Sequence, residues 1–491
     1  TETEVFYSAL ALVAVVRTRV VTGLTGRFLQ ILAGVLAVPI PFAFAVGEGV
    51  SVWAGFAVAS VSALVMGWLM SRVEVESPEA DEAMYVTVLG WTLAVLFGAV
   101  PFLPELSLVN AVFEAASGFT TTGISMVGDP GSLSRTLLFW RGFMQWVGGV
   151  GVLTFFVFVI KRSGGVTKRL YSAEANKTDA KSLHPSLKKS IGALVVAYIA
   201  LSTLFATTYF SLGMEPLNAV IYSFSTISTG GFETSAAGMA GFSPEIQGVT
   251  VFFMLFSAAN LILVYLILKL NPGPLAESDE FQLYIKIFLF VAAVIGIDLA
   301  SSTESVSRLA LDSLFQASAF VSSTGFLTRP VSVLGAGTLS VLLGAMFVGG
   351  CLGSTTGGIK VFRLKAMIEL ARRKKREYSL PNTAVNKVRI DREILSDSSL
   401  DTITVLVFMW VAFTGLGAVA TVYLEPLNFS EALSGTLSAA GTMGPVFFPE
   451  GHSVSALSPV TKLLWVGLMI AGRLEMLPLL AMFNSDLFRN K

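Results

Sequence analysis

Long apolar segments alternate with short polar ones along almost the whole chain. Ten of the apolar segments are poor in charge and close to the twenty or so residues that a helix needs to cross a bilayer. The predicted spans are 28–46, 50–70, 84–103, 137–160, 190–211, 247–270, 282–300, 337–350 and onward, 402–424 and 461–483. Residues 5–16 are apolar but too short to cross, so we interpret them as an interfacial or cytoplasmic-side segment. The pattern predicts an all-α polytopic membrane protein.

A second pattern recurs four times between these spans. Each copy begins with a polar residue and reaches a glycine thirteen positions later, after a run of Thr, Ser and Gly. The copies, which we call the hairpin segments, are 110–125, 218–233, 312–327 and 431–446. Identical spacing in four copies predicts an internal repeat.

The repeat predicts the organisation of the chain. Two leading spans precede four units, and each unit consists of a helix, a hairpin segment and a helix. We expect an N-terminal region with the two extra spans, residues 1–82, followed by repeats 83–170, 171–275, 276–375 and 376–491.

Each hairpin segment is too short to cross the membrane twice as helix. About ten residues suit a half-length helix, and Asn or Asp is a good N-cap. We expect Asn110, Asn218 and Asp312 to cap the first three helices. In the fourth, Ser430 is a better cap than Glu431. The Thr/Ser/Gly run must then return in an extended form, and such backbone survives at membrane depth only where protein buries it or water bathes it.

Four such strands around one axis would present rings of carbonyl and hydroxyl oxygens. These rings can replace the hydration shell of an alkali cation, and the C-terminal ends of the half-helices would direct partial negative charge to the same axis. We therefore predict a cation filter made of four quarters. Its residues are Thr120, Thr121, Thr122, Gly123, Ser228, Thr229, Gly230, Gly231, Ser322, Ser323, Thr324, Gly325, Gly441, Thr442, Met443 and Gly444.

Composition favours a membrane transporter and argues against other classes. Of the 491 residues, 54% are hydrophobic and 13% charged, against about 25% charged in soluble domains. The formal net charge is zero, which gives no reason to expect a nucleic-acid partner. One cysteine and two distant histidines make neither a disulfide framework nor a metal cluster. The spans carry no paired carboxylates or nucleophile–base set, so we do not expect an enzyme.

Charge predicts the orientation in the membrane. The loops 161–189 and 360–392 hold eight and eleven basic residues, whereas the loops beside the hairpin segments are mostly acidic. Basic loops stay on the cytoplasmic side. Both termini are therefore expected in the cytoplasm, with the hairpins opening outward.

Residues 349–360, GGCLGSTTGGIK, are too polar and glycine-rich to continue the preceding span. No Gly-Lys-Ser/Thr follows the glycines, which argues against a phosphate loop. An interfacial loop and a flexible loop within the membrane both remain possible. Arg473 lies inside the last apolar span, where an uncompensated charge is costly. Glu475 lies on another helix face, so Arg473 either forms an ion pair that fixes packing or contacts residues 349–360.

These motifs resemble those of the superfamily of potassium transporters that includes TrkH, KtrB and plant HKT proteins. The resemblance covers residues 28–483 and rests on the four filter glycines and three further motifs. Those motifs are Arg141-x4-Trp146-x-Gly148-Gly149-x-Gly151, the segment 349–360, and Gly472-Arg473-Leu474-Glu475. The two leading spans and the glycine-rich segment favour the TrkH branch.

The resemblance implies gated, channel-like potassium uptake across the cytoplasmic membrane. Because Gly123 is glycine and not serine, it implies a preference for potassium over sodium. It also implies that the segment 349–360 blocks the pathway below the filter and moves to open it. The implied gate residues are Gly349, Gly350, Gly353, Ser354, Thr355, Thr356, Gly357, Gly358, Lys360 and Arg473.

The resemblance further implies a homodimer, surrounded by membrane lipid, with a separate cytoplasmic subunit of the TrkA type. This chain has no nucleotide-binding motif and no expected covalent cofactor, so ATP, ADP or NAD would act only through that subunit. Three alternatives remain: a sodium-permeable pathway, a symporter coupled to protons or sodium, and a secondary transporter of organic solutes. The last would require inverted repeats and several charged residues within the spans, and the sequence has neither feature.

Overall fold

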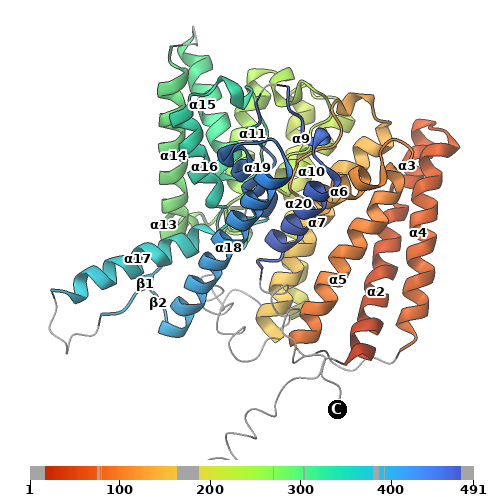
Figure 1. Ribbon diagram of the computed structural model, residues 1–491, viewed down its shortest axis with the longest axis horizontal. Coiled ribbons are helices and arrows are strands. Elements are labelled where there is room, and N and C mark those ends of the chain that lie inside the picture. The colour runs from red at the N-terminus through yellow and green to blue at the C-terminus, as the bar shows by residue number, and fades with distance from the viewer. Residues whose placement is uncertain are drawn as a thin grey trace, which may run out of the picture.

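The computed structural model describes residues 17–73, 78, 80–162, 187–268, 270–301, 305–379, 386–391, 393–449 and 451–476. Within them the protein is almost entirely helical (Figure 1), which confirms the all-α class. A two-stranded antiparallel sheet is formed by β1 (Arg389–Ile390) and β2 (Glu393–Ile394). The predicted interfacial segment 5–16, the centre of the basic loop 161–189 and the end of the last span lie outside the described residues.

The two leading spans form an antiparallel pair at one side of the molecule (Figure 1). The first consists of α2 (Thr18–Ala37) and α3 (Pro39–Val46), and the second is α4 (Val50–Ser71). The first span starts ten residues before its predicted beginning, because the helix continues through exposed Arg19 and Arg27. Gly47, in the left-handed conformation, ends α3 and begins the tight turn.

Each of the four repeats contains an incoming helix, a short helix and an outgoing helix. The first has α5 (Ala80–Ala99), η1 (Val100–Phe102), α6 (Leu108–Phe119), η2 (Pro130–Ser132) and α7 (Arg135–Arg162). The second has α9 (Leu187–Ser211), α10 (Pro216–Ile227), η3 (Gly238–Gly241), α11 (Pro244–Ser257), α12 (Leu261–Leu268) and α13 (Gly273–Glu277). The third has α14 (Asp279–Leu299), α15 (Val306–Val321), η4 (Val331–Val333), α16 (Ala336–Phe347) and α17 (Val361–Glu377). The fourth has α18 (Asp397–Leu424), α19 (Phe429–Gly441), η5 (Val454–Ala456) and α20 (Pro459–Arg473).

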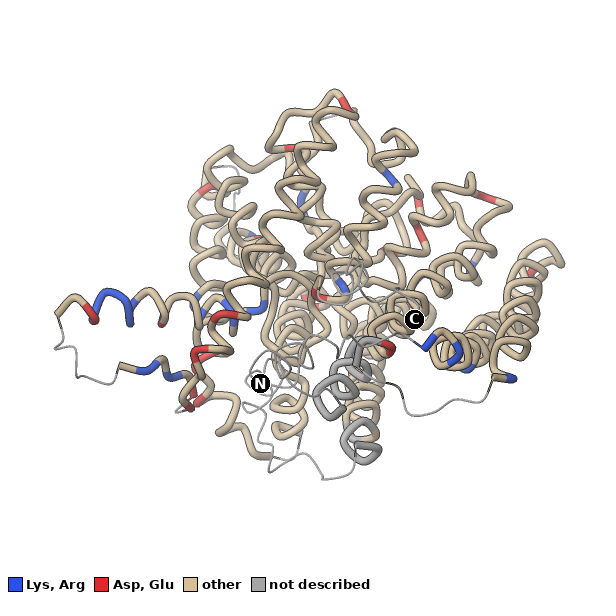
Figure 2. Tube along the Cα trace, turned by 60° about the horizontal axis from the view of Figure 1, so that its bottom comes forward, with Lys and Arg blue, Asp and Glu red and all other residues tan. Residues whose placement is uncertain are grey.

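The repetition extends beyond the hairpin segments. In every repeat a single 3₁₀ turn (η2, η3, η4 or η5) follows the hairpin and precedes the outgoing helix. The short helices α6, α10, α15 and α19 lie in the half of the molecule away from α17 and the small sheet (Figure 1). Figure 2 shows Lys and Arg concentrated along α17, which projects from the helical body. One buried apolar cluster extends through the leading helices and all four repeats.

Each of the ten predicted spans overlaps at least one described helix. Six described helices are long and apolar enough to cross a membrane, or seven if one bent pair counts as a single span. The chain is thus a multi-pass membrane protein. Two of the predicted spans fall short: α16 ends at Phe347, and α20 ends at Arg473.

The prediction of one continuous span over 247–270 is wrong. Helices α11 and α12 meet at an angle of 120° around Ala258 to Asn260. The Asn260 side-chain oxygen accepts hydrogen bonds from the amides of Ile262 and Leu263, at 3.0 and 3.4 Å. Asn260 therefore caps α12.

The predicted caps of the short helices are also wrong. These helices begin earlier than expected, so Asn110 and Asn218 are the third residues of α6 and α10, and Asp312 is the seventh of α15. In the fourth repeat, Asn428 is the cap and forms a capping box with Glu431. The fixed spacing of these polar residues has other uses, described below.

Candidate functional site

The four short helices end in the same backbone motif. In each, the amide of the residue before the filter glycine donates to the carbonyl five residues earlier, as in a Schellman motif. The four bonds are Thr122 to Ser117 (2.8 Å), Gly230 to Ser225 (2.7 Å), Thr324 to Ala319 (3.0 Å) and Met443 to Ser438 (3.0 Å). Each hairpin therefore leaves its helix in the same direction.

This motif places two residues per repeat in the left-handed region. The first is a Thr or Ser, at a cost of about 1–2 kcal/mol each because of its Cβ. The second is the filter glycine. The pairs and their φ angles are Thr121 (57°) and Gly123 (84°), Thr229 (54°) and Gly231 (75°), Ser323 (53°) and Gly325 (79°), and Thr442 (50°) and Gly444 (97°). Four repetitions of a strained conformation indicate that the surrounding structure holds it in place.

The four glycines form a closed ring. A Cβ added to each glycine would meet the carbonyl oxygen of the residue before the glycine in the next repeat. The facing pairs are Gly123 with Gly230, Gly231 with Thr324, Gly325 with Met443, and Gly444 with Thr122. The first three positions would overlap, whereas the fourth leaves 3.2 Å between the added Cβ and the Thr122 oxygen. The repeats are thus arranged in cyclic order, and the last contacts the first.

The exposure of the hairpin residues repeats in the same register in all four quarters. In each quarter the glycine is half-exposed and the three residues before it are buried. The hydroxyl oxygens of Thr121, Ser323 and Thr442 have no hydrogen-bond partner among the described residues, although buried polar groups normally have one. The sixteen predicted filter residues therefore occupy equivalent positions in one ring, in which three buried hydroxyls have no partner among the described residues.

A buried ion pair supports the first quarter from behind. Arg141 Nε donates to Glu114 Oε1 at 2.8 Å, and both side chains are buried. The same guanidinium donates to Ser125 Oγ at 3.0 Å and to the Glu233 carbonyl at 2.8 Å. Glu114 also accepts the Met126 amide at 2.7 Å. The pair therefore joins the first short helix to the returning strands of repeats one and two.

The residue in the register of Glu114 differs in each repeat. Tyr222 OH lies 3.5 Å from the Thr234 amide, and Gln316 donates to the Arg329 carbonyl at 2.8 Å. In the fourth repeat the position is Gly435, and the ring of Trp465 fills the space. These supporting residues were missed in the sequence, although a Glu and a Gln at equal distance before two filter glycines were a readable signal.

Gln145 makes a further contact that the sequence did not reveal. Its Nε2 donates to the Gly230 carbonyl at 2.7 Å, and its Oε1 accepts from Ser225 Oγ at 2.7 Å. It thus holds the carbonyl that faces Gly123. Gln145 lies between Arg141 and Trp146, inside a motif that served in the sequence only as evidence of the family resemblance.

The polar residues that start the hairpin segments make different contacts in different repeats. Asn110 Oδ1 accepts from Lys462 Nζ at 2.9 Å, which ties the first repeat to the fourth. Asp312 pairs with Arg308 at 2.7 Å and with Arg329 at 2.5 Å. Asp312 thus pairs within its own repeat and Glu431 belongs to a capping box, so the shared spacing reflects no single kind of contact.

Residues 348–360 form an irregular loop between α16 and α17. The amide of Gly349 donates to the Ile359 carbonyl at 2.8 Å, and the amide of Ile359 donates to the Phe347 carbonyl at 3.1 Å. This closes the loop at its base. Apart from half-exposed Gly353, the predicted gate residues of the loop are buried, which argues against an interfacial loop.

The loop lies directly beneath the ring. Thr355 Oγ1 donates to the carbonyl of Ile227, the last residue of α10, at 3.0 Å. A Cβ on Gly357 would overlap the Thr442 hydroxyl and the Gly441 carbonyl. The loop therefore reaches from the second quarter to the fourth.

Arg473 fixes the loop to the other side. Its two terminal nitrogens donate to the Thr355 carbonyl at 2.5 Å and to the Gly148 carbonyl of α7 at 3.1 Å. Of the two alternatives expected for Arg473 from the sequence, the contact with residues 349–360 is thus present. Glu475 pairs with Arg363 instead. Lys360 Nζ donates to Thr356 within the loop, at 3.0 Å from its hydroxyl.

Glu280 anchors the middle of the loop and the start of α17, and it was not predicted. Its Oε1 accepts the amides of Leu352 at 2.7 Å and Phe362 at 2.9 Å. On the opposite side the Cys351 amide donates to Ala258 at the break between α11 and α12, at 2.8 Å. The broken span of repeat two thus packs against the loop of repeat three.

Comparisons with known proteins identify the family and relatives of this chain. The family described as TrkH, cation transport protein, matches residues 48–293 and 280–490. Trk system potassium uptake protein TrkI of Halomonas elongata is 29% identical over 94% of each chain. Trk system potassium uptake protein TrkH of Salmonella typhimurium is 27% identical over 96% of this chain and 99% of that protein. The crystal structure of the potassium transporter TrkH from Vibrio parahaemolyticus matches 96% of this chain and all of that chain, with a TM-score of 0.85 and 24% identity. At this identity the likeness establishes the fold.

Proposed function

Because the chain belongs to the TrkH family of cation transport proteins, we propose that it takes up potassium across the cytoplasmic membrane through one channel-like pathway. The observation that carries this proposal is the closed ring of Gly123, Gly231, Gly325 and Gly444. Its half-exposed glycines and unpartnered hydroxyls suit a partly dehydrated alkali cation. Potassium is the transported ion and not a resident cofactor.

The filter consists of the sixteen residues of the ring, and potassium is preferred over sodium. Glycine at all four positions lets the neighbouring carbonyl approach closely, which sets the size of the opening. A serine at Gly123 would have to move the Gly230 carbonyl. Such a displacement enlarges or distorts the ring, and the energy difference between two alkali cations is sensitive to both.

The gate is the loop 349–360 together with Arg473. The supporting observation is its position beneath the second and fourth quarters, with Arg473 holding the Thr355 carbonyl. In this arrangement the loop closes the pathway, and opening requires it to leave these contacts. Gly353 and Gly358, both in the left-handed conformation, are the positions where the backbone can change direction.

The four repeats 83–170, 171–275, 276–375 and 376–491 act as quarters of one unit, and the two leading spans of the N-terminal region 1–82 pack outside it. Both termini lie in the cytoplasm, on the side of the basic helix α17. The chain functions as a homodimer with a separate cytoplasmic regulatory subunit of the TrkA type. Nucleotide binds to that subunit, and the basic run Arg372–Arg376 offers it an exposed charged surface.

The deciding experiment measures flux into liposomes that contain only the purified protein. Potassium, rubidium, sodium and lithium are compared under a controlled pH gradient. We expect potassium and rubidium to enter faster than sodium, and Gly123→Ser to reduce this preference. Gly128→Ser is the matched control, because no atom lies within 4 Å of a Cβ at that outer glycine.

Unchanged selectivity of Gly123→Ser in folded protein would refute the filter assignment. Uptake that stops when the pH or sodium gradient is removed would favour the coupled symporter. Equal sodium and potassium entry would favour the sodium-permeable alternative. Entry of none of the four ions would reject the proposed function.

A further inference from the structure

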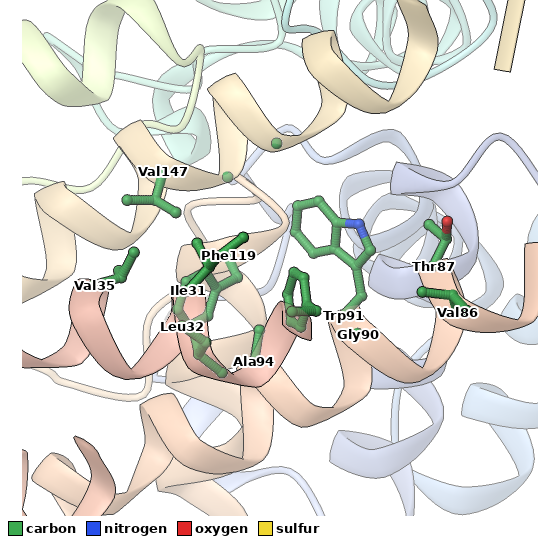
Figure 3. Close-up of a pocket in the computed structure, with 13 residues that line it drawn as sticks. Ile31, Leu32, Val35, Val86, Thr87, Gly90, Trp91, Ala94, Phe119 and Val147 are labelled. Atoms are coloured by element: carbon green, nitrogen blue, oxygen red, sulfur yellow. The ribbon is translucent and has the colours of Figure 1, made fainter. Parts of the chain in front are cut away.

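A cavity of about 400 Å³ opens between α2, α5 and α7, outside the ring of hairpins (Figure 3). Its lining is almost wholly apolar and includes Phe28 and Ile31 of α2, Trp91 of α5 and Val147 of α7. Thr87 is the one hydroxyl side chain among the lining residues. Ile31 is 69% exposed, so the cavity opens on the face that these helices turn to the bilayer.

The inner wall of this cavity belongs to the ion pathway. Phe119 is the last residue of the short helix α6, and Thr120, the first filter residue, follows it. Gly148 lines the cavity, and its carbonyl accepts the hydrogen bond from Arg473. A molecule that fills the cavity therefore touches both the first quarter of the ring and an anchor of the loop.

Arg27 marks the level of the lipid headgroups at the mouth of the cavity. The first span, 18–46, has 29 residues, which at 1.5 Å per residue is about 43 Å. A hydrocarbon core about 30 Å thick accounts for only the outer twenty or so of these residues. With Val46 at the outer edge of the core, Arg27 falls at its inner edge.

The position of Arg27 on the helix matches that of the cavity. Arg27 is exposed and directly precedes Phe28, and Ile31 lies one helical turn deeper on the same face. No ion pair holds Arg27 among the residues that the structure describes. A cationic group at the interface and an apolar cavity directly below it match the two halves of an anionic phospholipid.

The lipid headgroup, and not the acyl chain, is the source of the cavity's preference among lipids. An empty apolar cavity loses dispersion contacts along its walls, so an acyl chain from the bilayer fills it. A chain gains little hydrophobic free energy on moving from the bilayer into the protein, because both surroundings are apolar. Preference among lipids must therefore come from the charge at Arg27, which attracts anionic headgroups.

We propose that the cavity between α2, α5 and α7 holds one acyl chain of an anionic phospholipid whose phosphate pairs with Arg27. This inference rests on the proposed orientation in the membrane. It does not require that the protein transport potassium.

Trp91 provides a direct test because its indole lies in the cavity (Figure 3). The full-length protein is reconstituted in nanodiscs with phosphatidylcholine, to which phosphatidylglycerol or phosphatidylcholine with dibrominated chains is added. Bromine quenches tryptophan on contact, and subtraction of the Trp91→Phe variant isolates the signal of Trp91. We expect brominated phosphatidylglycerol to quench Trp91 at a mole fraction about fivefold lower than phosphatidylcholine, the equivalent of roughly 1 kcal/mol for one basic residue.

Arg27→Gln should remove this fivefold preference and keep the quenching itself, since Arg27 is exposed and its loss does not disturb the fold. The matched control is Arg72→Gln, at the same end of the neighbouring α4, where the guanidinium stacks on Trp68. Arg72→Gln should leave the preference at Trp91 intact.

Three results would overturn the proposal. Quenching of Trp91 by neither lipid would mean that no chain enters the cavity. Equal quenching by both lipids would mean that the cavity takes any chain of the bilayer. A preference that Arg72→Gln weakens as much as Arg27→Gln would assign it to the general surface charge. None of these results bears on potassium flux, so the proposed function can stand or fall separately.

Discussion

Arg141 Nε lies 2.8 Å from Glu114 Oε1, and this buried pair connects the first short helix to two strands of the ring. Taking two charges out of water is costly, and the remaining hydrogen bonds compensate for it. Removal of one partner leaves the other buried and unpaired. The pair therefore positions the ring that we propose as the filter, and it contacts none of the sixteen proposed filter residues.

Neutralising either partner should destabilise the protein and reduce selectivity together. Arg141→Gln and Glu114→Gln should each lower the free energy of unfolding by about 3–5 kcal/mol, the usual cost of breaking a buried pair. The double variant should lose less than the sum, since it leaves no unpaired charge. Thermal unfolding in detergent and the potassium-to-sodium flux ratio in liposomes measure both effects.

An exposed ion pair provides the control for this prediction. Arg135 and Glu215 are 61% and 50% exposed and lie 3.3 Å apart. Arg135→Gln should cost less than about 1 kcal/mol and leave the flux ratio unchanged. Additive losses in the Arg141 and Glu114 variants, or normal selectivity in both, would mean that the pair does not hold the filter.

The ring also predicts that the four glycines are not equally sensitive. All four have positive φ, so alanine pays the left-handed penalty at each. At Gly231 the new methyl also overlaps the Thr324 carbonyl, whereas at Gly444 it lies 3.2 Å from the Thr122 carbonyl. Overpacking typically costs about 1–3 kcal/mol. Gly444→Ala should therefore retain roughly tenfold more rubidium flux than Gly231→Ala.

Equal loss of flux in the two alanine variants would contradict this order. Folded protein is verified by size-exclusion chromatography before reconstitution. Gly337→Ala serves as the control for a glycine with no atom within 4 Å of its added Cβ. It should behave like the unmodified protein.

The fold and the ring could be predicted from the sequence because both produce periodic patterns of residues. Span length predicted the helices, and the fixed distance to Gly123, Gly231, Gly325 and Gly444 predicted the register of the repeats. The contacts that hold the ring are different in kind. Glu114 and Arg141 are 27 residues apart, and Lys462 and Asn110 are 352 apart. A local sequence pattern does not predict such distant partners. For that reason the polar residues of the repeat were wrongly predicted to be helix caps.

Irregular backbone was the other limit. The break at Ala258 to Asn260 lies in a sequence apolar enough for a continuous helix. It arises because the loop of another repeat supplies hydrogen bonds there, as in Cys351 to Ala258. Tertiary contacts can thus break a helix that the apolar pattern predicts to be continuous. The sequence of one span contains no information about such contacts.

Arg473 predicts a graded effect on gating. Two nitrogens of its guanidinium donate to two backbone carbonyls. One belongs to Thr355 in the loop and the other to Gly148 in α7. Hydrogen bonds from a charged donor contribute about 1.5–3 kcal/mol, which corresponds to roughly ten- to a hundredfold in the ratio of open to closed states. Arg473→Gln should raise potassium flux in that range. Arg473→Lys has one donor centre and should fall between.

Deletion of 352–357 tests the proposed gate independently. The deletion removes Thr355, so it should raise flux, and adding Arg473→Gln to it should have no further effect. Loss of flux in correctly folded deletion protein, or an additional increase in the combined variant, would separate Arg473 from the loop.

Glu280 provides the last prediction, because one carboxylate oxygen accepts an amide inside the loop, that of Leu352, and an amide at the start of α17, that of Phe362. Glu280→Ala leaves the amides of Leu352 and Phe362 without this buried acceptor, at about 1–3 kcal/mol each. The loop should then open more often. Hydrogen exchange of peptides from 349–360 should accelerate by about tenfold for every 1.4 kcal/mol lost, and basal potassium flux should increase.

The control for Glu280→Ala is Glu277→Ala, an exposed carboxylate three residues earlier that should change neither measurement. Glu280→Gln keeps one oxygen acceptor and should have an intermediate effect on exchange. If exchange accelerates in Glu280→Ala and flux stays constant, the loop is mobile but does not limit conduction. That outcome would contradict a gate at 349–360, even if the ring above it were a filter.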